Sequence, residues 1–180
     1  ATPQPVLISR APGQIVELRY DAKAGAGHAH PAAVSAAQLT AILKGVHVQA
    51  RDVIGAAGMF AGEESEPAFT DKETGELAPY LAAGLAKASP VDVVTFYLPR
   101  RDSNKARLVT SGGLFVRNHH LYIVLANVRT SRNAIQYETT YEPDTLDNPL
   151  LPITRFKFLA GFMPRSEEHT SELQSLAYLV

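Results

Sequence analysis

The sequence contains no cysteine and no tryptophan, and only two of its 180 residues are methionine. The absence of cysteine excludes disulfide bonds, thiolate zinc sites, iron–sulfur clusters and cysteine nucleophiles. No hydrophobic run approaches the ~20 residues that a membrane-spanning helix needs. Neither charge sign dominates, because 17 Lys and Arg stand against 18 Asp and Glu, a formal net charge of −1 at pH 7. No basic excess is therefore present to bind a nucleic-acid backbone.

Hydrophobic residues make up 46% of the sequence and charged residues 19%, which is typical of a folded domain. The length predicts one domain, which we expect to span residues 13–163. Residues 1–12 begin with Ala-Thr-Pro-Gln-Pro and are expected to form an N-terminal tether. Because the first residue is Ala1 rather than Met, we expect an upstream segment; a secretory signal, a lipoprotein anchor or a cytosolic leader would each fit.

Residues 164–180 are expected to lie outside this domain. Within them, residues 165–175 (RSEEHTSELQS) resemble the conceptual translation of a common sequencing-adapter oligonucleotide, and residues 176–180 can be read as its continuation. The resemblance implies that this tail is an assembly artefact with no part in the fold. The alternative is a genuine short helix capped by Ser166. Without residues 165–180 the chain carries 16 Lys and Arg against 15 Asp and Glu, a net charge of +1.

Two helices are predicted by their capping sequences and their hydrophobic spacing. Ser35 with Gln38, and Thr70 with Glu73, form capping boxes. The first helix ends at Gly45 and carries a hydrophobic stripe formed by Leu39, Ile42, Leu43 and Val46. The second helix ends at Ser89-Pro90, and its stripe comprises Leu77, Tyr80, Leu81, Leu85 and Ala88. Pro79 inside it could leave its first turn separate.

Alternating or continuous hydrophobic segments predict six strands, at residues 14–20, 46–51, 91–98, 106–116, 121–129 and 153–162. Asn118-His119 is expected to form a tight hairpin turn, and Gly112-Gly113 to mark a bulge or close backbone packing. The strands are concentrated late in the chain and joined by short links. This order predicts an α+β fold, with a mostly antiparallel sheet of about six strands and two helices on one face.

Four histidines are the candidate metal ligands. His28 and His30 are alternate residues of an extended segment, so their side chains could point the same way, and His119 and His120 could complete a site. No carboxylate lies at ligand spacing beside them. The alternative is that the first pair lies in a solvated loop and the second in a surface turn.

Two further groups are candidate binding residues. Arg100 and Arg101, with Lys105 and Arg107, form a basic turn that could bind phosphate or anionic headgroups, with Tyr97 and Phe96 nearby; the alternative is a solvated hairpin end. Asn127 and Arg129 are expected on one face of a central strand. There they would either form a structural network that ties down the loop at residues 137–152 or line the floor of a small pocket.

Two segments carry a resemblance to known proteins. Residues 110–131 (TSGGLFVRNHHLYIVLANVRTS) and 144–153 (DTLDNPLLPI) resemble a family of uncharacterised bacterial proteins, many of which are predicted envelope lipoproteins. The similarity spans about Ile8 to Phe162. It implies no activity and no catalytic residue. A lipoprotein needs an anchoring cysteine that this sequence lacks, so an envelope location depends on the upstream segment.

Together these observations predict a non-enzymatic, soluble, envelope-associated domain that binds a protein or small molecule or has a structural role. We expect no cofactor, no nucleic-acid partner and no catalytic residue. The upstream segment would supply a membrane tether, which places the domain in the periplasm or at the outer membrane. The alternative function is a metal-binding protein or metal-dependent enzyme that uses His28 and His30.

Overall fold

The computed structural model describes residues 1–50, 65–131, 148–153, 158–162 and 177–179. Within them the chain forms two helices, α1 (Ala36–Lys44) and α2 (Asp71–Lys87). The strands are β1 (Val6–Ala11), β2 (Gln14–Tyr20), β3 (Val46–Ala50), β4 (Glu66–Pro67), β5 (Asp92–Arg101), β6 (Arg107–Arg117), β7 (His120–Ser131), β8 (Phe158–Phe162) and β9 (Ala177–Leu179). The predicted α+β class is confirmed.

The strands form a main sheet in the order β1-β2-β5-β6-β7-β9 and a small sheet in the order β4-β3-β8. All pairs are antiparallel except that of β7 with β9, which is parallel. The prediction of one sheet differs from this arrangement, because β3 and β8 pair with each other and not with the main sheet. Both sheets and both helices nevertheless contribute to one cluster of buried hydrophobic side chains.

Both helices begin at the predicted capping boxes. The Ser35 hydroxyl accepts from the backbone N–H of Gln38 at 3.1 Å, and the Thr70 hydroxyl accepts from that of Glu73 at 3.1 Å. The helix α2 is continuous through the exposed Pro79, so the expected separate first turn does not form. Its buried residues hold it against the sheet over its whole length, which offsets the hydrogen bond that proline removes.

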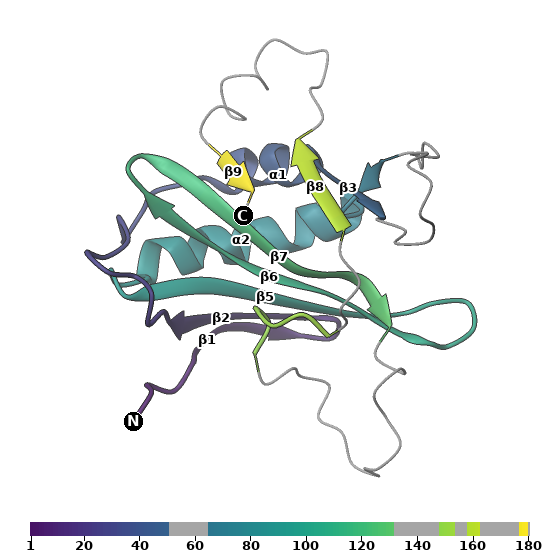
Figure 1. Cartoon of the computed structure of the whole chain (residues 1–180), viewed down its shortest axis with the longest axis horizontal. Coiled ribbons are helices and arrows are strands. Elements are labelled where there is room, and N and C mark those ends of the chain that lie inside the picture. The colour runs from purple at the N-terminus through teal and green to yellow at the C-terminus, as the bar shows by residue number, and fades with distance from the viewer. Residues whose placement is uncertain (51–64, 132–147, 154–157, 163–176, 180) are drawn as a thin grey trace, which may run out of the picture.

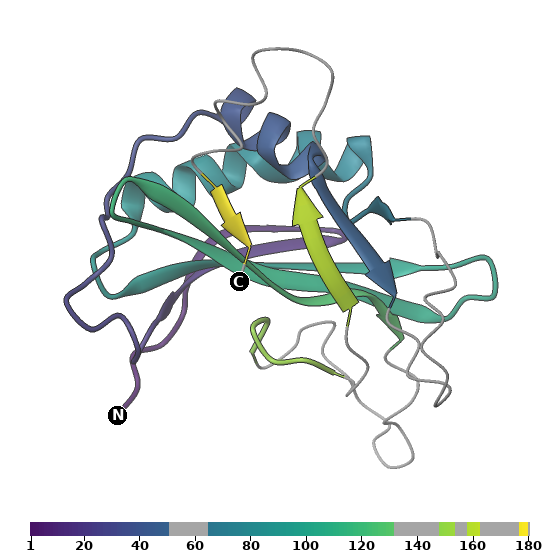
Figure 2. The same ribbon diagram turned by 45° about the horizontal axis from the view of Figure 1, so that its top comes forward.

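The two helices cover one face of the main sheet, as Figures 1 and 2 show. The side chains that face them from β5 are Val94, Phe96 and Leu98, all 0% exposed. Ile123 in β7 is also 0% exposed and belongs to the same core, as expected for the centre of a sheet. Burial of these side chains supplies the main driving force for folding.

The opposite face of the main sheet is also buried. Tyr97, Val109 and Asn127 on that face are exposed by 2%, 1% and 1%. Residues 148–153 lie below the sheet in Figure 2, on the side away from the helices. A Cβ added at Gly113 would come within 2.9 Å of a methyl group of Leu150 in this segment. The middle of the sheet is therefore enclosed between two layers.

The predicted close backbone packing at Gly112-Gly113 is confirmed, but the bulge itself lies in β7, which carries the extra residue at both register shifts. The register between β6 and β7 shifts on both sides of Ser111, and the space beside Gly112 is closed. A Cβ at Gly112 would lie 2.0 Å from the carbonyl oxygen of Val124 and 3.0 Å from the ring of Phe96. Such a contact with backbone is prohibitive, so only glycine fits at this position.

The turn between β6 and β7 is the predicted two-residue hairpin. Arg117 pairs with His120, and the two residues between them have positive φ angles, 50° at Asn118 and 63° at His119. Positive φ at both central residues is the signature of a type I′ turn, whose twist matches that of the flanking strands.

Three segments differ from the predicted boundaries. Residues 6–11, assigned to the N-terminal tether, form β1 at the edge of the main sheet. Residues 66–67, which lie outside the six predicted strands, form the short β4. The last predicted strand is observed only as β8, and residues 154–157 of that prediction lie outside the described residues.

The described part of the C-terminal tail, residues 177–179, is a strand and not the helix weighed as an alternative. Residues 163–176, which include the proposed Ser166 cap, lie outside the described residues.

Candidate functional site

A pocket with a volume of about 190 Å³ lies at the C-terminal end of β5 and the N-terminal end of β6. Its walls are formed by both strands together with the turn between β1 and β2. The lining residues are Gly13, Tyr97, Pro99, Arg100, Arg101, Arg107, Leu108 and Val109.

The register of β5 and β6 explains the composition of this pocket. Arg101 pairs with Arg107, and Pro99 pairs with Val109. Residues directly opposite each other in an antiparallel pair share a face, as do alternate residues along a strand. These four side chains therefore lie on the same face as Tyr97, which is the face away from the helices.

Arg101 supplies an accessible positive charge to the pocket. Its side chain is exposed and makes no hydrogen bond or ion pair with the described part of the chain. Arg107, opposite, is half-buried and contributes a second guanidinium group. None of the lining residues that the structure describes is acidic. The arrangement is suited to an anion, because a guanidinium group donates paired hydrogen bonds to a carboxylate or phosphate.

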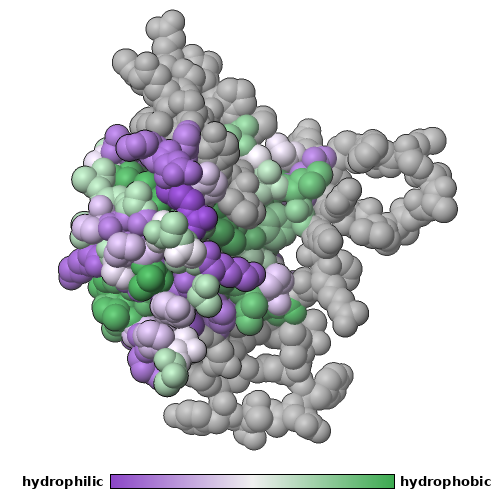
Figure 3. Space-filling view, turned by 60° about the vertical axis from the view of Figure 1, so that its left-hand side comes forward, coloured by the Kyte–Doolittle hydropathy of each residue, from purple (hydrophilic) through white to green (hydrophobic). Residues whose placement is uncertain are grey.

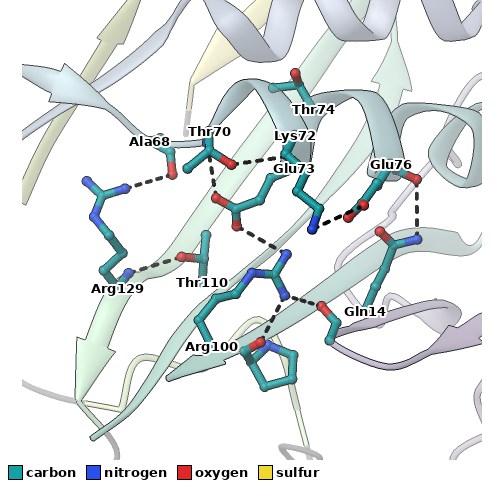
Figure 4. A network of polar contacts seen from close by, with 12 residues as sticks. Gln14, Ala68, Thr70, Lys72, Glu73, Thr74, Glu76, Arg100, Thr110 and Arg129 are labelled. Carbon is teal, nitrogen blue, oxygen red and sulfur yellow. Dashed lines mark hydrogen bonds and ion pairs between the residues drawn. The ribbon is translucent and has the colours of Figure 1, made fainter. Parts of the chain in front are cut away.

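Arg100 has a different role from its neighbour. One of its guanidinium nitrogens donates to the carbonyl oxygens of Gly13 and Pro99, and the other lies 3.5 Å from the carboxylate of Glu73 (Figure 4). Glu73 also belongs to the capping box of α2 and has a side chain only 10% exposed. Arg100 therefore joins the β1–β2 turn to the start of α2, and its charge is balanced within the protein.

The position of the Arg100 side chain in the pocket wall requires a glycine at position 13. The φ angle of Gly13 is +79°, a value that favours glycine, and a Cβ there would meet Arg100 at 2.8 Å.

Asn127 forms a structural network and does not line the pocket. Its Nδ2 donates to the hydroxyl of Ser111 at 2.9 Å and to the carbonyl of Leu151 at 3.0 Å. Its Oδ1 accepts from the backbone N–H of Ile153 at 2.8 Å. Of the two interpretations of this residue, these bonds favour the network that ties down the following loop. The described part of that loop is held against the sheet by one buried amide.

Arg129 does not share this site, and the expectation of a common face with Asn127 is wrong. Its φ angle is +45°. The register with β6 shifts between the pairs Ser111–Asn127 and Val109–Thr130, so that two residues of β7 stand opposite one residue of β6. The alternation of faces along β7 is interrupted there. Its guanidinium group reaches β4 instead, where it donates to the carbonyls of Pro67 and Ala68 and lies 2.8 Å from the carboxylate of Glu66 (Figure 4 shows its contact with Ala68). Arg129 therefore connects the two sheets.

His28 and His30 are buried, 4% and 7% exposed, and not solvated as the alternative to a metal site supposed. Their ring centroids are 5.4 Å apart. The Nε2 of His28 lies 2.8 Å from a carboxylate oxygen of Asp21, and its Nδ1 lies 3.4 Å from the guanidinium group of Arg117. These contacts occupy both nitrogens of the ring.

Both nitrogens of His30 are engaged as well. The backbone N–H of Val116 donates to Nε2 at 3.0 Å, so Nδ1 carries the proton and donates to the carbonyl of Ser89 at 3.3 Å. Burial, the largest effect, lowers the pKa of His30 below its ordinary value of 6.5. Through their contacts with Val116 and Arg117, the two histidines attach the segment at residues 21–33 to the end of β6.

The other two histidines belong to the β6–β7 hairpin. His119 is exposed in the turn, and His120 begins β7. Among the described residues, no three His, Asp or Glu side chains are grouped so that they could hold a metal ion. The structure therefore brings His28 and His30 together, but not with the second pair as a ligand set.

No protein-family model, no curated protein and no solved structure matches this chain. The fold and the geometry of the pocket therefore carry the functional argument. No helix in the described part of the chain has the length and hydrophobicity needed to cross a membrane. The side of the molecule in Figure 3 carries hydrophilic and hydrophobic residues interspersed.

Sequence reasoning located the basic turn but missed most of the pocket. Gly13, Pro99, Leu108 and Val109 were not singled out, and Phe96, expected near the basic turn, lies in the core on the opposite face. The available signal was the alternation along the strand, which places Tyr97, Pro99 and Arg101 on one face. The residues of β6 that complete the pocket can be identified only when the pairing of β5 with β6 is known, and the sequence does not give this pairing.

Proposed function

We propose that this chain is a non-enzymatic binding domain of the bacterial cell envelope, and that the pocket between the ends of β5 and β6 is its ligand site. The observation that carries the proposal is the placement of Arg101 beside a pocket of about 190 Å³, with an exposed guanidinium group that no described residue engages. An arginine that pairs with none of the described residues, at the mouth of a partly apolar pocket, is suited to hold and orient a small ligand.

A binding role is also supported by the structural roles of three buried titratable side chains. His28, His30 and Glu73 are buried, and each is engaged by neighbours that fix a loop or a helix end. None of these three adjoins the pocket as a lining residue. These three groups are therefore used to hold the fold together.

The ligand site is tested by titrating the ¹⁵N-labelled protein with benzoate and with benzyl alcohol and following the amide shifts. We expect at least one probe to shift the amides of Gly13, Tyr97 and Val109. The Leu108→Trp variant should fill the pocket and abolish these shifts, whereas Leu159→Trp, at an exposed position of β8, should leave them unchanged. Absence of any shift at the lining residues with both probes would overturn the proposal.

The envelope location rests on the sequence resemblance alone, so it needs its own test. Fractionation of cells that express the full-length natural protein, followed by immunodetection, should recover it with periplasm or membranes. Recovery with the cytosol would refute this part of the proposal and leave the ligand site standing.

A further inference from the structure

The pocket presents two kinds of surface to a ligand. Pro99 and Leu108 supply apolar surface to it, and Tyr97 and Val109, which are 2% and 1% exposed, also line it. Its rim is positively charged, with Arg101 and Arg107 on opposite strands. A ligand that matches both surfaces has an apolar body and an anionic group at one end.

The volume limits the size of that ligand. An apolar protein cavity of roughly 150 Å³ is large enough to bind benzene. The present pocket, at about 190 Å³, can therefore accept one six-membered ring or a branched chain of similar size, together with a small head group.

The charge at the site indicates the kind of head group. Arg100 is balanced by Glu73, Arg107 has an interaction of its own, and Arg101 is the guanidinium group that the described residues leave accessible. One such group is matched by a single negative charge. A planar carboxylate also fits the planar guanidinium fork through two parallel hydrogen bonds.

We propose that the ligand is a small monocarboxylate with an apolar body, held by the Arg101 guanidinium group while the body packs against Pro99, Leu108 and Val109. This inference rests on the proposed function and adds the ligand class and the residue that recognises it. Arg100 acts as a positioning residue, because its bonds to Gly13 and Pro99 hold the wall beside Arg101.

The test compares three probes by isothermal titration calorimetry: benzoate, the neutral benzyl alcohol and phenyl phosphate. We expect benzoate to bind at least tenfold more tightly than benzyl alcohol, and phenyl phosphate to bind no better than benzoate. Arg101→Gln should weaken benzoate binding by tenfold or more and leave benzyl alcohol unchanged. Because the exposed Arg101 side chain makes no hydrogen bond or ion pair with the described residues, this variant should fold as the parent does.

The matched control is Lys87→Gln, which removes one positive charge from the exposed last turn of α2, at the end of the helix opposite Glu73. It should leave benzoate binding unchanged within twofold. Equal affinities for benzoate and benzyl alcohol, or an Arg101→Gln variant that binds benzoate normally, would overturn the monocarboxylate inference but not the binding site. Tighter binding of phenyl phosphate would also overturn it, in favour of a phosphate ester.

Discussion

The backbone N–H of Val116 in β6 donates a hydrogen bond of 3.0 Å to Nε2 of His30. This bond requires an unprotonated Nε2, so the folded protein holds the imidazole in its neutral form. Asp92 and Arg117 also lie in this region, as does His28, whose charge opposes protonation of His30. The loop that contains both histidines therefore has an attachment that depends on pH.

We expect acid to destabilise the protein through His30. Its pKa is lowered in the folded state, mainly by burial, so the neutral form stabilises the fold above pH 6.5, and this contribution is lost as the pH falls below that value. Urea unfolding at pH 7.5 and pH 5 measures the loss. His30→Gln, which can still accept from Val116, should reduce the pH dependence, whereas His119→Gln in the exposed turn should not. An unchanged pH dependence in His30→Gln would contradict the assignment.

Truncation of the network at Asn127 should destabilise the protein. Asn127→Ala leaves the Ser111 hydroxyl, the Leu151 carbonyl and the Ile153 N–H without their partner, and we expect a loss of about 2–4 kcal/mol in the free energy of unfolding. Denaturant titration measures it, and proteolysis should cleave the segment near residue 151 more readily. Asn104→Ala, at an exposed position, should change stability by less than about 0.5 kcal/mol.

Ile123 tests the position of the core. Ile123→Ala removes a side chain that is 0% exposed, and we expect a loss of about 2–5 kcal/mol. Val6→Ala, at a position 57% exposed in β1, is the control and should be close to neutral. A near-neutral result at Ile123 would show that the side chain does not lie in a packed core.

The hairpin turn offers a stabilising substitution. His119 has a φ of 63°, which disfavours a residue with a Cβ, so His119→Gly should raise the free energy of unfolding by about 0.5–1 kcal/mol. Thermal unfolding followed by circular dichroism checks this. The same change in β3, His47→Gly, should have the opposite sign. Destabilisation by both changes would contradict the type I′ assignment.

Removal of residues 165–180 should leave the melting temperature unchanged within experimental error. The tail resembles a translated adapter, and its described strand pairs with β7 only between Leu121 and Ile123. Differential scanning calorimetry of the truncated and complete chains makes the comparison. A large drop would identify the tail as part of the domain.

The helices and the late hairpins could be predicted because their signals are local. A capping box involves residues three positions apart, and the Asn118-His119 turn joins strands that are neighbours in sequence. The strand β1 was missed because its burial does not alternate and it follows a proline-rich start. The small sheet was missed because β3 and β8 are more than 100 residues apart and pair only in the folded chain.

The candidate site shows the same division. The basic character of residues 100–107 is visible in the sequence, but the separation of Arg100 from Arg101 is not. It follows from alternation along β5: both residues line the pocket, but Arg100 is paired with Glu73 and Arg101 has no ion pair with a described residue. The bulge that separates Arg129 from Asn127 depends on the pairing with Thr110 and Ser111, which is a tertiary property.

The tight packing around Gly112 requires glycine at this position of the fold. The obstacle beside it is a backbone carbonyl, which cannot be relieved by exchanging a neighbouring side chain. Any chain that keeps this strand packed between the bulged β7 and an aromatic ring should therefore retain glycine there, however far the remaining residues have diverged. A glycine at this position, together with an aromatic residue at the position of Phe96, offers a way to find distant members of the fold where overall similarity has faded.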